Sequence, residues 1–400
     1  MELDCLLCVV TILFSARKEV KKKDLINWLI GMEMIEDPLK GEQVLGQLID
    51  EGFIDRVIEN KTIHNRYKMH QTVLDKLERK MNPVRFRHNL SEGNLAISII
   101  DDEREEANLN SKICESISKM KNVKLLSLGS SGSPYIGDRL IELERVINLS
   151  STLRNLSKVK YLSLEGISRI VMLPRTIFKL KNLKVLDLKA YLTMCYMLDH
   201  TPFEVSDLRN LVVLKGFVIN DNDTHIRYTE PCVLFDLWQF RCLAKLSIRT
   251  RRMDFPNQVD FEALRSMDEL INLKITWIGK SDVSSKRIKY SDNVFPAKLK
   301  KIGLEAAPAA IASQLLELIS KQIGVEKVYI KGGRLWDFGP SRAIKFDRVK
   351  FLRLRYLHNL HINWSDFRST FPNLERLEIF ECRNLIFFPC DQNGVWECLE

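Results

Sequence analysis

The sequence predicts an α/β protein in which a small helical domain precedes a curved array of short repeats. Three observations support this architecture. The chain has 400 residues, which is too long for one compact core. Leucine returns at a nearly regular spacing through most of it, whereas residues 1–80 carry a pattern of helices and one hairpin. We expect a domain over 1–80, a helical linker over 81–121 and a repeat array over 122–400.

Composition excludes several classes of protein. Hydrophobic residues make up 45% and charged residues 28% of the chain, which is unlike a disordered or fibrous protein. The net charge of +9 is modest for this length and does not indicate a specific nucleic-acid partner. The nine cysteines are scattered, which favours a reducing, cytoplasmic compartment over a disulfide scaffold. The apolar run over 6–14 is about half the roughly 20 residues needed to cross a bilayer, so we expect no membrane span.

The motif L-x-x-L-x-L recurs from about residue 122 onward. Its central residue, called the anchor here, spaces the repeats by about 27 residues on average, near the upper end of the range for leucine-rich repeats. Leu126 is an earlier anchor, and we expect one degenerate repeat between it and Leu162. About ten irregular repeats would form a leucine-rich-repeat solenoid, a horseshoe with a parallel sheet on its concave face. The regular anchors are Leu162, Leu186, Leu214, Leu246, Leu273, Ile302, Val328, Leu352 and Leu377.

Alternation along each repeat strand separates core from surface. Successive side chains of a strand point to opposite faces, so the anchors point into the stack and their neighbours point to the concave surface. Basic residues outnumber acidic ones among these neighbours, and aromatic residues lie between them, which suits a partner with an acidic surface. Solvated lysine and arginine would give the same pattern. The expected partner-binding residues are Lys189, Lys215, Lys245, Arg249, Lys274, Lys327, Tyr329, Lys331, Phe351, Arg353, Arg355 and Arg376.

Residues 1–80 show the order helix, helix, helix, hairpin and helix, which is a winged-helix arrangement. The third helix carries acidic residues and no Lys or Arg between Gly41 and Gly52, so DNA reading by this domain is not expected. The helices are expected over 3–14, around 25–30, around 44–49 and over 71–80, and the hairpin strands over 53–58 and 66–69.

A winged helix followed by repeats of this kind resembles the C-terminal half of plant nucleotide-binding leucine-rich-repeat (NB-LRR) disease-resistance proteins. Residues 374–389 read L-x-x-L-x-I-x-x-C-x-x-L-x-x-F-P, with Cys382 at the cysteine of the family's repeat. The segments 5–14, 24–31 and 41–53 are similar to the family's winged-helix segments, and the resemblance covers nearly the whole chain. It implies an intracellular protein of innate immunity, whose repeats recognise a pathogen effector or a guarded host protein in the defense response.

The resemblance also assigns a role to His70. Met69-His70-Gln71 stands where the family has Met-His-Asp, and in relatives that histidine reaches a phosphate of bound ADP. Here Gln71 replaces the acidic residue. The sequence has no G-x-x-x-x-G-K-[ST] loop, because Gly279-Lys280-Ser281 is preceded by Lys274 at the position of the first glycine.

The coiled-coil and nucleotide-binding portions that precede the winged helix in relatives are missing. We therefore expect a truncated gene product or a partial sequence without a cofactor of its own, ADP or ATP being bound only in full-length relatives. A nucleotide-binding domain supplied by another chain is then a second expected partner.

Catalysis is not expected. The sequence has no H-E-x-x-H or G-x-S-x-G motif, and Cys5 and Cys8 have no second cysteine pair or nearby histidine to complete a zinc site. Residues 95–102 end in two aspartates but follow the winged helix, so we interpret them as linker. Two other interpretations stay open. One is a general leucine-rich-repeat adaptor not tied to immunity, and the other is an extracellular repeat receptor, which six Asn-x-Ser/Thr sequons favour.

Overall fold

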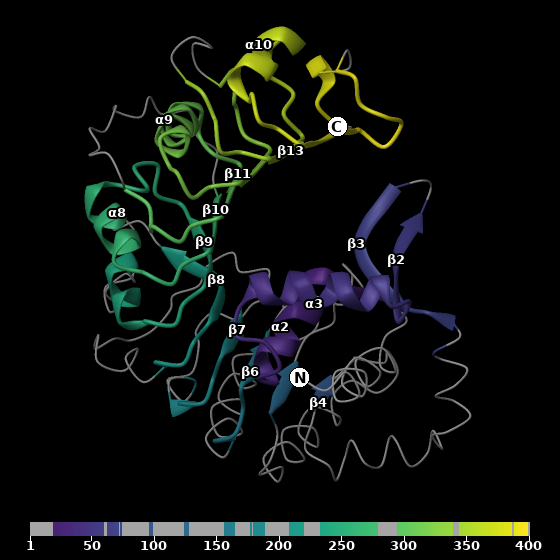
Figure 1. Ribbon diagram of the computed structural model, residues 1–400. Coiled ribbons are helices and arrows are strands. Elements are labelled where there is room, and N and C mark those ends of the chain that lie inside the picture. Colours follow the sequence, from purple (N-terminus) through teal and green to yellow (C-terminus); the bar gives the residue numbers. More distant parts are fainter. Residues whose placement is uncertain are drawn as a thin grey trace, which may run out of the picture. The chain divides into compact units, whose positions relative to one another are not determined.

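The computed structural model divides the chain into two compact units, Met1–Leu214 and Lys215–Glu400 (Figure 1). The expected helix over 3–14 and most of the expected helix over 71–80 lie outside the described residues, as do Lys189 and the triplet 279–281. The structure describes residues 19–59, 62–71, 73, 96–98, 124–127, 156–164, 177, 179–188, 208–219, 233–278, 294–338, 344–385 and 388–398.

The described residues of the first unit, from 19 onward, start with two helices and a small antiparallel sheet in the order β1-β3-β2. Asp37 caps α3 by accepting hydrogen bonds from the amides of Leu39 and Lys40, and Gly52, with a φ of 73°, follows the end of this helix. The hairpin turn is shorter than expected because the pairs Ile58–Ile63 and Glu59–Thr62 extend the ladder. The elements are β1 (Val20–Lys21), α2 (Lys22–Gly31), α3 (Pro38–Asp50), β2 (Ile54–Glu59) and β3 (Thr62–Met69).

Parallel repeat strands follow in the same unit. They are β4 (Ala96–Ser98), β5 (Leu125–Ser127), β6 (Tyr161–Ser163) and β7 (Val185–Asp187), each paired with the next. One expectation is corrected, because strand β4 lies within the segment that was expected to be a helical linker. The anchors Leu126 and Leu162 oppose each other directly in the hydrogen-bonded pair β5–β6. The residues of the degenerate repeat expected between them, 128–155, lie outside the described residues.

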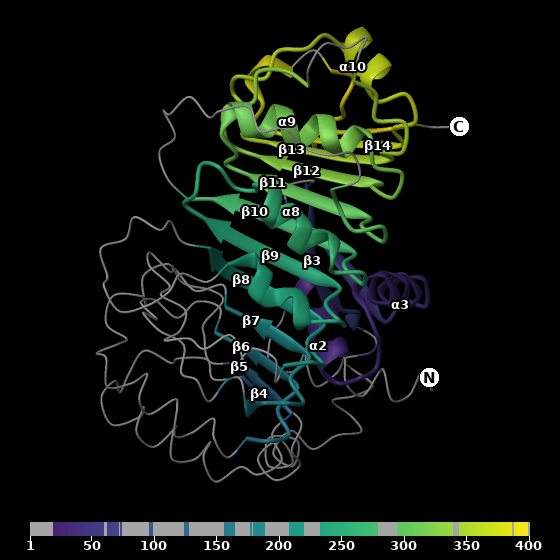
Figure 2. The same cartoon turned by 90° about the vertical axis from the view of Figure 1, so that its left-hand side faces the viewer.

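The second unit contains a parallel sheet in the order β9 to β14, closed by the antiparallel strand β15. Strand β8 (Val213–Ile219) spans the boundary between the units. Figure 2 shows the strands stacked in sequence order, with α8, α9 and α10 on one side of the sheet. The strands are β9 (Lys245–Thr250), β10 (Asn272–Trp277), β11 (Lys301–Glu305), β12 (Lys327–Lys331), β13 (Phe351–Arg355), β14 (Arg376–Phe380) and β15 (Val395–Glu397). The helices are η4 (Leu234–Gln239), α8 (Gln258–Arg265), α9 (Ala309–Ser320), α10 (Trp364–Thr370) and η5 (Arg383–Leu385).

The predicted anchors occupy equivalent positions in this sheet. Leu246 opposes Leu273, which opposes Ile302, and the register continues through Val328, Leu352 and Leu377. All six side chains are at most 2% exposed. One parallel strand per repeat, with its anchor buried in register, confirms the prediction of an α/β leucine-rich-repeat solenoid.

Side-chain hydrogen bonds also link successive repeats. Asn182, Asn210, Asn373 and Asn384 each donate from Nδ2 to a backbone carbonyl of the preceding repeat, at 2.7 to 3.0 Å. Three of them stand immediately before the first leucine of the motif, as in Asn373-Leu374. They satisfy carbonyls at the turns that the strand ladder does not reach.

Each of four consecutive strands in the second unit ends in a left-handed residue. Ala306, Gly332, Tyr356 and Glu381 follow β11 to β14 with φ between 53° and 61°. The amides of the first three donate to the last carbonyl of the next strand, at 2.8 to 2.9 Å. Ala306, Tyr356 and Glu381 are not glycine, so the left-handed conformation has a local energetic cost at these residues. At Ala306 and Tyr356 the hydrogen bond of the amide offsets part of this cost.

We expect Leu352→Ala to lower the free energy of unfolding by about 2 to 5 kcal/mol, because a fully buried anchor is removed from a packed stack. Chemical denaturation followed by circular dichroism measures this change. Hydrogen exchange should localise the loss to β12–β14, since repeats contact mainly their neighbours. The control is Ile323→Ala, at a side chain that is 79% exposed, with an expected change under about 0.5 kcal/mol. Equal effects of the two substitutions would contradict the anchor assignment.

Candidate functional site

The face of β9–β14 opposite the anchors, called the open face here, carries three rows of aligned side chains. Nine of its eighteen residues are lysine or arginine and two are glutamate, so positive charge dominates. The strand register aligns the rows. They are Lys245, Asn272, Lys301, Lys327, Phe351 and Arg376; Ser247, Lys274, Gly303, Tyr329, Arg353 and Glu378; and Arg249, Thr276, Glu305, Lys331, Arg355 and Phe380.

Glu305 joins side chains of three successive repeats. Its carboxylate forms ion pairs with Lys274 and with Lys331, the latter at 2.6 Å from Nζ to Oε1, and accepts a hydrogen bond from Thr276 Oγ1 at 3.2 Å. The side chain is 19% exposed. Burial by itself would raise the pKa of Glu305, but hydrogen bonds from Lys274 and Lys331 outweigh it and lower this pKa to about 2. Glu305 is therefore a charged, fully engaged part of the sheet.

Glu378 on β14 is likewise held by cations of the open face, namely Arg353 of β13 and Arg376 of its own strand. It accepts a hydrogen bond from Arg353 Nε and contacts Arg376 Nε at 3.3 Å, while Arg376 also pairs with Glu397. Burial opposes ionisation of Glu378, yet the bond from Arg353 and the nearby arginine charges keep its pKa below the ordinary value. Both glutamates of the open face are thus paired with cations of the sheet, which reduces their repulsion of an incoming anion without abolishing it.

Aromatic rings separate the cations. Lys301 Nζ lies 4.0 Å and Arg353 Cζ lies 4.6 Å from the centroid of the Tyr329 ring, and the Phe351 ring is 5.4 Å from that of Tyr329. Cation–π contacts of this kind hold the charged groups against the sheet. The result is an ordered surface of fixed cations and rings, which limits the entropy lost when a partner binds.

Most of the sequence-predicted binding residues share this face. The exception among the described residues is Lys215 on β8, which is only 5% exposed. All seven residues of β8 are buried, so the alternation of core and surface does not apply to this strand. The expectation that Lys215 belongs to an accessible binding surface is wrong. The residues on the open face are Lys245, Arg249, Lys274, Lys327, Tyr329, Lys331, Phe351, Arg353, Arg355 and Arg376; their role in binding stays a prediction.

In the first unit, helix α2 packs on strands β6 and β7 (Figure 1). The Trp28 and Tyr161 rings meet edge to face at 6.5 Å, and Glu33 pairs with Lys160 and with Lys184, the latter at 3.0 Å. These two lysines lower the pKa of Glu33. At Gly31, a Cβ would lie 2.7 Å from Tyr161 Cβ, so glycine is needed for this approach.

This contact corrects another sequence-based expectation. The neighbours of the anchors on β6 and β7, namely Tyr161, Ser163, Val185 and Asp187, were expected on the accessible concave surface. They are at most 3% exposed. Burial also raises the pKa of the Tyr161 phenol, and the charge of Asp187 adds to this effect. Alternation along a strand predicts which side chains share a face, but whether another segment covers that face is not encoded in it.

His70 directly follows β3. Its amide donates to the carbonyl of Phe53 at 3.0 Å, which places it at the base of the hairpin, and its side chain is partly exposed. The assignment of a nucleotide contact to His70 rests on the family resemblance and stays a prediction. Across the described ranges, no group of three or more His, Cys, Asp or Glu is arranged to hold a metal ion.

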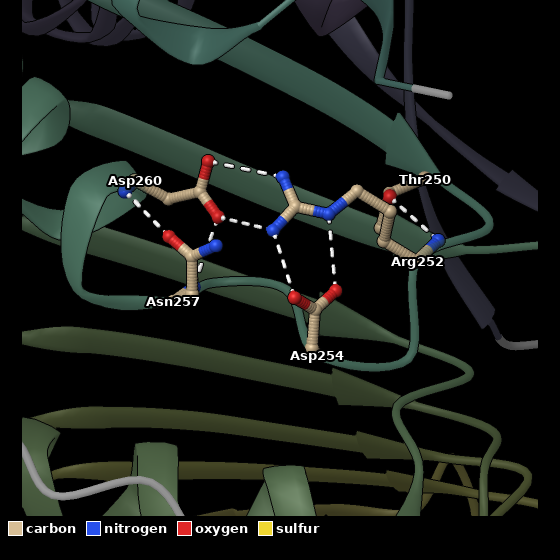
Figure 3. A network of polar contacts seen from close by, with 5 residues as sticks. All are labelled: Thr250, Arg252, Asp254, Asn257 and Asp260. Atoms are coloured by element: carbon tan, nitrogen blue, oxygen red, sulfur yellow. Dashed lines mark hydrogen bonds and ion pairs between the residues drawn. The ribbon is translucent and has the colours of Figure 1, made fainter. Parts of the chain in front are cut away.

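A polar network around Arg252 fixes the loop between β9 and α8 (Figure 3). The Arg252 guanidinium lies between two carboxylates, with Nε 3.0 Å from Asp254 Oδ1 and Nη2 3.1 Å from Asp260 Oδ2. Asn257 and Asp260 form a reciprocal capping box at the start of α8. Burial raises the pKa of Asp260, whereas the hydrogen bond from Arg252 lowers that of Asp254. This network is structural, since both carboxylates are occupied by Arg252.

The cysteines that the structure describes are free: Cys242, Cys382, Cys390 and Cys398. Cys382 is buried at the position that the repeat motif predicts, and burial raises the pKa of its thiol. No helix in the described part of the chain combines the length and the apolar character needed to span a bilayer.

Comparison with known proteins adds only distant structural likenesses. No protein-family model matches the sequence, and no curated protein matches it. The leucine-rich-repeat protein LIC12759 of Leptospira interrogans is 14% identical, with a TM-score of 0.37 over 67% of this chain and 69% of that one. A TDR receptor is 16% identical, with a TM-score of 0.33 over 73% of this chain and 39% of its own. The leucine-rich-repeat domain of APL1B is 13% identical, with a TM-score of 0.30 over 80% of this chain and 94% of its own.

The present chain thus spans well under two thirds of the TDR receptor. The leucine-rich-repeat assignment rests on the strand register of this structure and not on these likenesses.

We expect Glu305 to make stability pH-dependent in acid. Its folded pKa of about 2 lies below the value of about 4.3 for an unfolded chain, so its contribution is present above pH ~5 and is lost as the pH falls toward 2. The stability difference between the wild type and Glu305→Gln should shrink by about 1.5 kcal/mol from pH 5 to pH 3. Urea denaturation at several pH values measures it.

The control is Glu375→Gln, at a carboxylate that is 62% exposed and pairs with Lys350 on the surface. Its stability difference should change by less than about 0.5 kcal/mol over the same range. A pH-independent difference for Glu305→Gln would show that the carboxylate is not held by Lys274 and Lys331.

We expect Arg252→Met to lower the free energy of unfolding by about 3 kcal/mol, because it leaves the buried Asp260 without its cation. Asp254→Asn should cost under about 1 kcal/mol, since the Asp254 side chain is 61% exposed. Thermal denaturation of both variants tests the difference. Equal losses would mean that Asp260 does not depend on Arg252.

Proposed function

We propose that this chain is the recognition part of an intracellular plant immune receptor of the NB-LRR type. In this proposal the open face binds a protein, either a pathogen effector or a guarded host protein. The observation that carries the binding proposal is the excess of nine cations over two internally paired carboxylates on one ordered sheet face. The immune assignment is supported by the sequence resemblance, namely the winged-helix pattern over 1–80, Met69-His70-Gln71 and the Cys382 repeat.

The chemistry of the open face favours an acidic protein surface. Fixed lysine and arginine side chains steer an acidic partner and accelerate its association, and the effect weakens with salt. Tyr329, Phe351 and Phe380 supply the aromatic area on which binding energy concentrates in protein interfaces. Glu305 and Glu378 interrupt the positive rows, which disfavours a continuous phosphate backbone as the ligand.

We further propose that the chain performs no reaction. It would act in the cytoplasm as a binding module without a cofactor of its own, and ADP or ATP would be held by a nucleotide-binding domain in the full-length receptor or in another chain. His70 would face that nucleotide, by resemblance to the Met-His-Asp motif. Purified chain is accordingly expected to carry no stoichiometric ADP or ATP, which liquid chromatography of the denatured protein measures.

The binding proposal predicts that reversing three cations of the open face abolishes partner capture. The variant Lys331→Glu, Arg353→Glu and Arg355→Glu should lose proteins that the wild type enriches from pathogen-challenged leaf tissue, by at least about tenfold in quantitative mass spectrometry. Binding of the purified, enriched partner should weaken as salt rises for the wild type, because screening reduces attraction between exposed charges.

The matched control reverses three cations that are exposed outside the sheet, Lys345, Arg348 and Arg383. It changes the net charge by the same amount and should retain the partner. Circular dichroism verifies folding, and the milder variant Lys331→Gln with Arg355→Gln serves if the triple reversal unfolds. Loss of the partner in both triple variants, or in neither, would contradict binding at the open face. A partner enriched equally from unchallenged tissue would exclude a pathogen effector and leave a guarded host protein or the partner of a general adaptor.

A further inference from the structure

We infer that Arg355 is a carboxylate-binding residue, which receives an aspartate or glutamate side chain from an acidic segment of the partner protein. This inference rests on the proposed function and adds a residue and a ligand chemistry to it. It also holds that the free protein keeps this side chain in place at a cost to its own stability.

The position of Arg355 sets it apart on the open face. It is the last residue of β13, in register between Lys331 of β12 and Phe380 of β14. The next residue, Tyr356, adopts the left-handed conformation with a φ of 57°. The Tyr356 and Phe380 rings meet edge to face at 5.4 Å and are 42% and 44% exposed. Arg355 therefore lies beside an accessible pair of rings at the end of the strand.

The hydrogen bonding of Arg355 differs from that of the cations around it. Lys274 and Lys331 share Glu305, and Arg353 and Arg376 share Glu378. By contrast, Arg355 Nε is buried and has no hydrogen-bond partner among the residues that the structure describes. The Arg355 Cζ atom lies 5.8 Å from the Phe380 ring centroid, a contact that supplies no acceptor atom. A guanidinium has five N–H donors, so leaving a buried one unmatched costs free energy.

The electrostatic environment of Arg355 also disfavours its positive charge. Burial lowers the pKa of Arg355, and the charge of the neighbouring Arg353 lowers it further, against a smaller opposing effect of Glu378. The guanidinium is still charged at neutral pH, so it remains an incompletely compensated cation in a half-buried site. A cation retained for stability is expected to have a partner of its own, as Arg353 does. Among the described residues Arg355 lacks such a partner, and it is instead suited to bind an anion from a ligand.

The residues around Arg355 indicate which kind of anion would bind there. A carboxylate accepts two parallel hydrogen bonds from a guanidinium, and adjacent rings exclude water from such a pair. A segment that presents a single carboxylate at Arg355 avoids Glu378, which lies diagonally across on the next strand. A polynucleotide would carry further phosphates toward that glutamate. The structure thus favours a protein carboxylate over a nucleic acid.

The test compares three methionine substitutions in the full chain, at Arg355, Arg353 and Arg383. Without ligand, Arg355→Met should raise Tm by about 2 °C, since it removes an unmatched buried donor and a like-charge contact. Arg353→Met should lower Tm because it leaves Glu378 without its main partner. Arg383→Met, at an exposed position outside the strands, should leave Tm unchanged within about 1 °C.

The binding probe is a fluorescein-labelled peptide of alternating glutamate and serine, measured by fluorescence anisotropy at low salt. Arg355→Met should weaken its affinity by at least about tenfold, whereas Arg383→Met should retain it. Arg355→Lys keeps the charge but loses the planar fork, so it should fall between them. The matched peptide of glutamine and serine should bind the wild type at least about tenfold more weakly than the acidic peptide.

Several outcomes would overturn the inference. These are a fall in Tm for Arg355→Met, unchanged binding of the acidic peptide by that variant, equal binding of the two peptides by the wild type, and tighter binding of a dT20 oligonucleotide than of the acidic peptide. The proposed function is judged separately. If the triple charge reversal removes the partner but Arg355→Met does not weaken the peptide, the open face binds through other residues and only the role of Arg355 is refuted.

Discussion

The parallel backbone ladder is the constraint on which the rest of the structure depends. A strand of five or six residues with its turn cannot bury an apolar face alone, so each repeat is stable only against its neighbours. In the second unit the ladder holds Leu246, Leu273, Ile302, Val328, Leu352 and Leu377 opposite one another. The same register fixes the other face of the sheet. Lys274, Glu305 and Lys331 come from three repeats and meet because their strands are aligned.

A second set of interactions connects the repeats outside the strands. Asparagines such as Asn373 hydrogen-bond to the preceding turn, and left-handed residues such as Tyr356 close each strand onto the next. These bonds satisfy backbone groups at the places where the ladder ends. They also fix the position of the residue that follows each strand. In this way Tyr356 comes to lie beside Phe380 and Arg355. Local backbone conformation therefore shapes the chemistry at the edge of the open face.

The cations of the open face differ in whether a glutamate of the sheet pairs with them. Four of the nine cations, Lys274, Lys331, Arg353 and Arg376, pair with Glu305 or Glu378, whose lowered pKa values keep these carboxylates ionised. These pairs order the surface and contribute to stability. Arg355 has no such partner for its buried Nε. In the proposed recognition, this contrast separates residues that maintain the sheet from Arg355, whose guanidinium is proposed to receive a carboxylate of the partner.

The sequence by itself determined the repeat spacing and the anchors, because apolar periodicity and strand alternation are local properties. It also placed ten of the predicted binding residues on one face. It did not reveal β4, the direct pairing of Leu126 with Leu162, or the glutamate bridges, since these depend on which strands become neighbours. The burial of Lys215 and Tyr161 was decided by tertiary structure alone. Whether a segment such as α2 covers a strand face depends on packing between residues far apart in the chain, such as Trp28 and Tyr161, and no local pattern encodes that contact.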